Sequence, residues 1–222
     1  MIRPEILSNN EIYHIFNRGV DKKPIFIDKK DYSHAIETLD YYRFLDPPTR
    51  FSYFLKTNSD EKAIFQRQLE SHTKLVKIIA YCLMPNHYHL ILKQNYENGI
   101  SKFISLFQNS YAKFFNQRHE RIGHLIQGSF KSVRVISNEQ LLHLGRYIHL
   151  NPVNAFLIKS EDLSTYQWSS YPHYLGKQHM QLIESDIILN NFTDNNAYKL
   201  FVENTTKQQD IELIHHLTFD ET

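Results

Sequence analysis

The chain has 222 residues, of which 14% are aromatic, and its formal net charge is +1. This length suits one full domain with an appendage, and the aromatic side chains can supply a large apolar core. No apolar run approaches the roughly 18 residues of a membrane span, the N-terminus lacks the apolar core of a signal peptide, and the single cysteine, Cys82, cannot form an internal disulfide. We therefore expect a cytoplasmic protein with no membrane partner.

Strand and helix patterns alternate along most of the chain. The elements expected first, in chain order, are a strand at about 11–17, a helix at 31–44, strands at 75–83 and 87–93, a helix at 101–118 and a strand at 131–136. This β-α-β-β-α-β order predicts an α+β fold, namely a ferredoxin-like antiparallel sheet with helices on one face.

Three further segments lie outside that pattern. Residues 45–70 are expected to form an insertion, because they contain Pro47-Pro48 and then a helix at about 60–71. A mostly buried helix is expected at 138–151, capped by Ser137 or Asn138 and ended by Pro152. The helices expected in the C-terminal extension are at about 183–190, 195–204 and 208–217.

The strand at 87–93 begins with His87-Tyr88-His89. Alternate side chains of a strand point to the same face, so His87 and His89 lie together and Tyr88 lies opposite. Neutral imidazole is a common metal ligand, and such a pair can converge on one divalent ion. Taken alone, the pair is a weak signal, because two hydrogen-bonded histidines of a sheet are the commoner explanation.

The helix at 138–151 carries Tyr147 and, four residues later, Asn151. Residues four apart share one face of a helix, so the hydroxyl and the amide can address the same point. If that point is an ion on His87 and His89, the site has three protein ligands and a nucleophile beside them. The alternatives are a half-buried structural tyrosine and an asparagine that caps the helix end.

Two other residues have side chains of a metal-ligand or nucleophile type, namely His149 and Tyr111. His149 falls on the opposite side of the helix from Tyr147, so we interpret it as structural. Tyr111 is the rival nucleophile, but it has Phe115 and no ligand-type residue at the i+4 position.

The charges are unevenly distributed. Residues 101–150 hold seven Lys or Arg and two Asp or Glu, a net of +5, whereas residues 178–222 hold two Lys and eight Asp or Glu, a net of −6. A basic segment around the expected site suits a phosphate backbone. The candidate DNA contacts are Arg18, Lys22, Lys23, Lys113, Arg118, Arg121, Lys131, Arg134 and Arg146. The acidic segment could occupy the basic groove as an electrostatic mimic of DNA.

At the two motifs the chain resembles the REP-associated tyrosine transposases, within the single-tyrosine HUH transposases. The hallmarks are two histidines around a hydrophobic residue and a helical tyrosine followed four residues later by an amide or acid. The segments that also match are Tyr13 to Val20, Tyr111 to Asn116, Gln127 to Ser132 and Trp168 to Tyr171. The resemblance runs from about residue 11 to 176, so we expect a catalytic domain at 1–176 and an acidic, mostly helical extension at 177–222.

The resemblance implies cleavage and rejoining of single-stranded DNA, with hairpin-forming repeats as the partner. Tyr147 would be the catalytic nucleophile, and His87, His89 and Asn151 would hold Mg²⁺ or Mn²⁺. No nucleotide cofactor is expected, because the chemistry is phosphodiester exchange and no phosphate-binding glycine-rich loop is found. Relatives include dimers that exchange the tyrosine helix and forms that act alone, so both a monomer and a homodimer are compatible. The residues flanking Gln127-Gly128, Ile126 and Ser129, depart from the family pattern, which concerns substrate recognition and not the catalytic set.

Two other functions remain as alternatives. A non-catalytic, domesticated nucleic-acid-binding regulator would keep the fold without turnover, although the presence of His87, His89 and Tyr147 favours the enzyme. A replication-initiator nickase shares the catalytic plan but usually carries a further large domain, for which this chain has no room.

Overall fold

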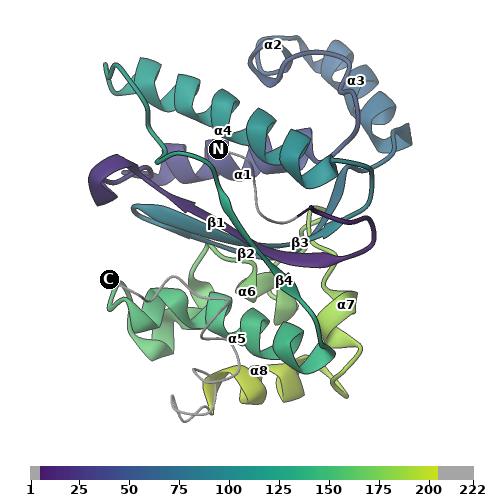
Figure 1. Ribbon diagram of the computed structural model, residues 1–222, viewed down its shortest axis with the longest axis vertical. Helices are drawn as coiled ribbons and strands as arrows, with labels where there is room; N and C mark the ends of the chain where they lie inside the picture. Colours follow the sequence, from purple (N-terminus) through teal and green to yellow (C-terminus); the bar gives the residue numbers. More distant parts are fainter. Residues whose placement is uncertain (1–5, 205–222) are drawn as a thin grey trace.

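The computed structural model describes residues 6–204, and within them the centre of the molecule is a four-stranded antiparallel sheet (Figure 1). The strands are β1 (Ile12–Arg18), β2 (Val76–Met84), β3 (His87–Gln94) and β4 (Lys131–Val135). Their spatial order is β2-β3-β1-β4, so β3 and β1 occupy the middle. This order and direction are those of the expected ferredoxin-like arrangement.

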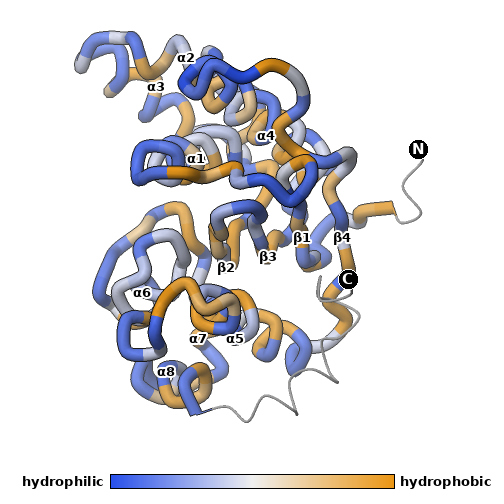
Figure 2. Tube along the Cα trace, turned by 90° about the vertical axis from the view of Figure 1, so that its left-hand side faces the viewer, coloured by the Kyte–Doolittle hydropathy of each residue, from blue (hydrophilic) through white to orange (hydrophobic). Residues whose placement is uncertain are grey.

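The helices form two layers, one on each face of the sheet (Figures 1 and 2). On one face lie α1 (Lys29–Tyr42) and α4 (Gly99–Arg118), the two helices of the β-α-β-β-α-β unit, which therefore share a face as expected. On the other face lies α5 (Asn138–Asn154), the helix that carries Tyr147. The side chain of any strand residue thus faces one of two different helical layers.

The insertion forms two helices beyond α1, α2 (Phe51–Phe54) and α3 (Ser59–Ser71). Phe51 is buried, and its ring lies 5.2 Å from that of Tyr41 on α1. The backbone N–H of Phe51 also donates to the Tyr42 hydroxyl at 3.2 Å. Aromatic packing therefore fixes the insertion to the helical layer that is remote from α5.

Helix α5 begins where the sequence predicts and ends later. The Ser137 side chain accepts a hydrogen bond from the backbone N–H of Gln140, which confirms the expected cap. The expected end at Asn151 is wrong, because α5 continues through Pro152 to Asn154. Proline removes only one N–H, and its fixed φ is compatible with a helix. The turn is closed instead by the N–H of Ala155, which donates to the carbonyl of Asn151 at 2.9 Å.

The C-terminal part of the described chain packs on α5. It contains the 3₁₀ helix η2 (Ser160–Thr165) and the helices α6 (Tyr171–Tyr174), α7 (Asp186–Leu189) and α8 (Asn195–Glu203). Ile188, Tyr198 and Val202 of α7 and α8 are fully buried. The helix expected at 208–217 lies outside the described residues. Between residues 6 and 204, every helix is too short or too polar to cross a membrane.

Candidate active site

The two histidines of the motif begin strand β3 directly after the turn Pro85-Asn86. A loop holds this turn in place: the N–H of Gly19 donates to the carbonyl of Asn86 at 2.8 Å, and the Asn86 side-chain amide donates to the carbonyl of Lys22 at 3.0 Å. The start of β3 is therefore fixed from outside the sheet, and the rings of His87 and His89 project toward the layer of α5.

His89 is fully buried and has one unsatisfied nitrogen. Its Nδ1 lies 2.9 Å from Nε2 of His14 on β1, whereas its Nε2 has no hydrogen-bond partner. Burial lowers the pKa of His89 well below its usual value, and the neighbouring His87 and His14 lower this pKa further. A neutral buried imidazole with an open nitrogen is what a metal ligand requires, because buried polar atoms otherwise find partners.

His87 stands at the edge of the site with its ring 5.0 Å from that of His89 and nearly perpendicular to it. Its Nδ1 lies 2.6 Å from the side-chain oxygen of Asn86, which orients the ring. Burial, and then the charge of Arg18, lower the pKa of His87 to about 4. His87 is therefore also neutral near pH 7 and able to ligate.

Helix α5 brings Tyr147 and Asn151 to the same place. The Tyr147 ring lies 5.7 Å from the His89 ring at an interplanar angle of 89°. The amide nitrogen of Asn151 donates to the carbonyl of Tyr147 at 3.0 Å, which leaves the amide oxygen as the atom suited to a metal. The two motifs, 58 residues apart in sequence, meet as the i, i+4 spacing predicts.

These residues line one cavity of about 460 Å³. Its lining consists of Arg18, Lys22, Asn86, His87, His89, Tyr147, Asn151, Asn154 and Ala155. Within residues 6–204 no cluster of three or more His, Cys, Asp and Glu side chains could hold a metal. The side chains of this cavity that could donate to an ion are two imidazoles and one amide oxygen, and they lie beside two cationic side chains.

Several candidate DNA contacts lie away from this cavity because they are engaged elsewhere. Arg118 pairs with Asp28 at 2.6 Å and with buried Asp31 at 2.7 Å, so it links α4 to the start of α1. Arg146 is mostly buried and stacks over the ring of Phe201 on α8 at 4.2 Å.

Other candidates are dispersed over the surface. Arg134 pairs with Glu11, and Lys23 lies 3.5 Å from Asp21. The three remaining candidates lie on α4, just after α4, and on β4, and they are Lys113, Arg121 and Lys131. Of the nine basic residues, the cavity brings only Arg18 and Lys22 to the two motifs.

The rival nucleophile Tyr111 is built into the core. It is fully buried, and its hydroxyl donates to the carbonyl of Ile25. Burial raises its pKa far above the usual value for tyrosine. A hydroxyl that is already bonded and shielded from solvent cannot reach a nucleic acid.

His149 is structural, as expected. It is fully buried on α5, where its Nδ1 lies 2.8 Å from the Tyr198 hydroxyl and its Nε2 lies 2.8 Å from the Ser170 hydroxyl. His149 therefore ties the tyrosine helix to α6 and α8.

The sequence reasoning missed His14. The only signal was a histidine at an alternate position of an apolar strand, and such a pattern does not say which strand lies alongside. Pairing of β1 with β3 supplies the missing information, because it sets Phe16 opposite His89 and leaves His14 diagonal to it.

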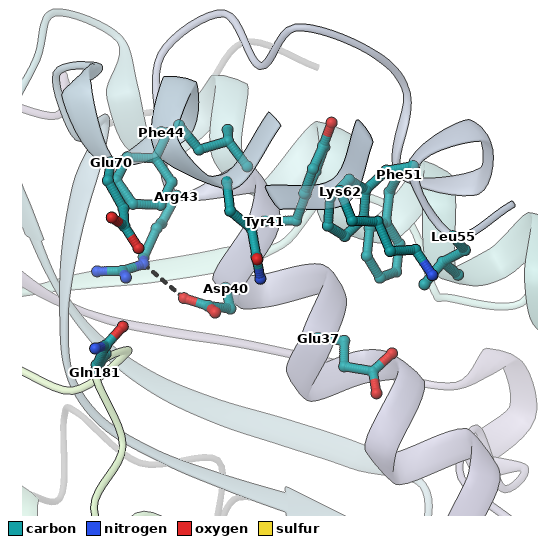
Figure 3. A pocket seen from close by; sticks show the side chains of 13 residues that line it. Glu37, Asp40, Tyr41, Arg43, Phe44, Phe51, Leu55, Lys62, Glu70 and Gln181 are labelled. Carbon is teal, nitrogen blue, oxygen red and sulfur yellow. Dashed lines mark hydrogen bonds and ion pairs between the residues drawn. The ribbon is translucent and has the colours of Figure 1, made fainter. Parts of the chain in front are cut away.

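A second cavity, of about 340 Å³, lies between α1 and the insertion helices (Figure 3). Its polar lining carries both charges, with Glu37, Asp40 and Glu70 beside Lys62 and Arg43. Asp40 and Arg43 form an ion pair at 2.8 Å. The three carboxylates disfavour a phosphate ligand, and the cavity holds neither of the two motifs.

The comparisons with known proteins agree with this fold. The profile of the family described as "Transposase IS200 like" matches residues 36–151, which is more than half of the chain. The chain belongs to this family of transposases. Comparison with curated protein sequences finds no significant match.

A solved structure of a REP-associated tyrosine transposase bound to a REP hairpin is similar in fold, with a TM-score of 0.51 and 13% identity over 83% of this chain and 96% of that one. A candidate transposase from Deinococcus radiodurans R1 is 15% identical over 67% of this chain and 95% of that one, and the TM-score of this pair is 0.34.

Proposed function

We propose that this transposase cleaves and rejoins single-stranded DNA through a covalent 5′-phosphotyrosine link to Tyr147. The observation that carries the proposal is the open Nε2 of His89, a buried nitrogen without a partner beside the ring of Tyr147. Side chains that can bind a metal and a side chain that can act as a nucleophile thus line one cavity, together with Arg18 and Lys22.

The chemistry is an exchange of phosphodiesters. The Tyr147 oxygen attacks a backbone phosphorus, the bond from phosphorus to the 3′-oxygen breaks, and the 3′-oxygen takes up a proton while the phenol proton passes to water. The phosphate stays on the 5′ side and is now joined to Tyr147. An incoming 3′-hydroxyl reverses the step, so no nucleotide cofactor is needed.

The residues of the cavity meet the electrostatic demand of this step. Tyrosine has a pKa of about 10 in water, so the attack needs help at neutral pH. Arg18 and Lys22 supply positive charge near the phosphate, where it stabilises the charge that builds on the oxygens. A divalent metal on His87, His89 and Asn151, either Mg²⁺ or Mn²⁺, would polarise the scissile phosphate.

We propose hairpin-forming repeat DNA as the substrate. The similar solved structure is described as bound to a REP hairpin, and the likeness in fold covers most of both chains. Unpaired bases flanking a hairpin provide the single strand that a nucleophile on a helix can reach.

The test is a denaturing gel of the full chain with labelled single-stranded hairpins from repeats near its gene, with Mn²⁺ or with EDTA. We expect a metal-dependent protein–DNA adduct that Tyr147→Phe abolishes and Tyr111→Phe retains. An adduct that survives Tyr147→Phe would overturn the choice of nucleophile. Hairpin binding without any adduct would instead favour a non-catalytic, domesticated nucleic-acid-binding regulator.

A further inference from the structure

His14 and His89 form a buried pair on the two central strands. Both are fully buried, and Nε2 of His14 lies 2.9 Å from Nδ1 of His89. Their rings are 5.1 Å apart and close to parallel, and the Phe16 ring lies 4.7 Å from His14 and 6.1 Å from His89. Three packed rings leave the histidines little room to rotate.

A hydrogen bond between two ring nitrogens needs one proton, so two arrangements are possible for neutral rings. If His14 donates, His89 carries its own proton on Nε2. That N–H would then be a buried donor without an acceptor, which costs about 1–3 kcal/mol. If His89 donates from Nδ1, its Nε2 is a bare lone pair, an open acceptor that a metal ion can fill.

We propose that His14 is a positioning residue, which accepts the Nδ1–H of His89 and so holds the Nε2 lone pair of His89 toward the cavity. The inference rests on the proposed function for the purpose of that lone pair, which is to bind the metal. The hydrogen bond between the two rings limits the neutral pair to two arrangements, and only the one in which His89 donates leaves its Nε2 able to bind a cation.

This arrangement has a general physical logic. A ligating histidine usually donates its second ring N–H to a carboxylate, a carbonyl or water, and that bond fixes tautomer and orientation. Here the acceptor is a second imidazole on the adjacent strand, at a diagonal position of the β1–β3 register. The acceptor is therefore neutral and rigidly held.

The experiment reads the tautomer directly, without metal. The full chain is labelled with ¹⁵N-histidine and long-range ¹H–¹⁵N correlations are recorded for the metal-free protein. We expect His89 to carry its proton on Nδ1. A proton on Nε2 in the wild-type protein would overturn the inference whether or not the protein binds metal.

Direct titration with Mn²⁺ supplies the second readout. His14→Phe keeps an aromatic ring but removes the acceptor, and we expect it to weaken Mn²⁺ binding about 10- to 100-fold. His14→Gln offers an oxygen acceptor and should recover much of the affinity. His34→Phe is the matched control, because His34 lies on α1, stacked on Phe114 at 3.6 Å.

The outcomes separate this inference from the proposed function. Equal Mn²⁺ affinity of His14→Phe and wild type would overturn the role of His14. If the wild-type protein carries the His89 proton on Nδ1 but does not bind Mn²⁺, the proposed metal site is contradicted. The inference that His14 fixes the tautomer of His89 would still hold. If His14→Phe does not fold, the wild-type tautomer and the affinity of His14→Gln still decide the question.

Discussion

Tyr111 and Tyr147 are both tyrosines on helices, yet their surroundings give them opposite properties. Tyr111 packs against Phe26 with its hydroxyl bonded to the carbonyl of Ile25, whereas Tyr147 lines the cavity beside His89. The Tyr111 hydroxyl contributes to stability, whereas Tyr147 is the proposed nucleophile. The sequence alone ranked Tyr147 above Tyr111 through the i+4 neighbour but gave no measure of burial.

Tyr111→Phe should therefore lower the free energy of unfolding by about 1–3 kcal/mol, because it leaves the buried Ile25 carbonyl without its donor. Tyr147→Phe should lower it less, because the Tyr147 side chain is only half-buried and lines a cavity. Urea unfolding of the two variants measures both values. Equal losses would contradict the separate roles.

Asn151 offers a test of the donor set. Asn151→Ala removes the amide oxygen and should weaken Mn²⁺ binding, whereas Asn151→Asp substitutes a carboxylate, which suits Mn²⁺, and should strengthen it. Asn138→Ala, at the other end of the same helix, is the matched control and should leave the affinity unchanged. Calorimetric titration with Mn²⁺ makes the comparison, and unaltered binding in Asn151→Ala would remove Asn151 from the site.

At the level of elements, α5 depends on its contacts with both the sheet and the C-terminal helices. Gly145 shows how closely they approach, because a Cβ added there would lie 2.9 Å from Cδ1 of Ile188 and 3.6 Å from the Tyr198 hydroxyl. Together with the bonds of His149, this packing sets the position of the helix that carries Tyr147. The extension is thus part of what shapes the cavity.

Deleting residues 177–222 should consequently destabilise the whole protein. It removes Ile188, Tyr198 and Val202, and burial of each such side chain contributes about 1.5–3 kcal/mol. Thermal unfolding of the chain ending at residue 176 should show a strongly lowered Tm. An unchanged Tm would mean that α7 and α8 contribute little to α5.

Because deletion of the whole extension is expected to destabilise the protein, a shorter deletion is needed to test whether the acidic segment mimics DNA. Deletion of 205–222 keeps α8 and removes Asp210, Glu212, Asp220 and Glu221, half of the acidic residues beyond residue 177. Of the other acidic residues, Glu184 already pairs with Lys74 at 2.6 Å. If the segment is a mimic, this shorter deletion should raise the affinity for single-stranded DNA in a filter-binding assay, whereas unchanged affinity would argue against the mimic.

His149 makes the anchoring of α5 sensitive to acid. Burial lowers its pKa to about 3 in the folded protein, whereas the unfolded value is about 6.5. Between these values the unfolded chain binds the extra proton, so the stabilisation is complete above about pH 6.5 and is lost as the pH falls toward 3.

The expected slope from His149 alone is about 1.4 kcal/mol of unfolding free energy per pH unit below 6.5. Chemical denaturation at pH 7, 6 and 5 measures it. His149→Gln, which cannot titrate, should be less stable at pH 7 but show a shallower decline. Parallel curves for the two proteins would exclude His149 as the source.

Local patterns predicted the strands and main helices to within a few residues, because β1, β2 and β3 are rich in apolar residues and the main helices carry apolar residues at helical spacing. The continuation of α5 past Pro152 was not predictable, since it depends on hydrogen bonds of residues after the proline. The sequence also could not predict on which face of the sheet α5 packs, because a helix that follows the last strand can pack on either face. The sheet order followed from the sequence of elements.

On the scale of the whole molecule, both halves of the site come from the same chain. The rings of His89 and Tyr147 are 5.7 Å apart within one molecule, so no exchange of α5 between copies is needed to assemble the cavity. We therefore propose that the chain acts in cis, whether it is a monomer or a dimer.

Mixing two inactive variants tests this proposal. A mixture of Tyr147→Phe and His89→Ala should form no covalent adduct, because each chain lacks one half of its own site. In a helix-exchanged dimer, mixed pairs would contain one intact site and the adduct would reappear. Recovery of adduct after co-expression, which allows pairs to form, would therefore reject action in cis.

The basic residues show the limit of charge counting along a sequence. The count found a net charge of +5 over residues 101–150, but it could not say that Arg118 and Arg134 are paired with carboxylates or that Arg146 is buried against α8. Such pairings join residues about 50 to 120 positions apart. They depend on the tertiary fold, which brings Arg18 and Lys22, out of the nine candidates, into the lining of the cavity.

Strand β3 separates two helical layers, and this has an evolutionary consequence. His87 and His89 face α5, whereas Tyr88 faces α4, where its ring meets Phe107 and its hydroxyl accepts a hydrogen bond from Gln108. Adjacent positions of one strand therefore pack against different layers. In homologous sequences, substitutions at Tyr88 should covary with substitutions on α4, and those at His89 with substitutions on β1 and α5. The layer of α1 and α4 can therefore change in sequence without altering the residues of the proposed active site.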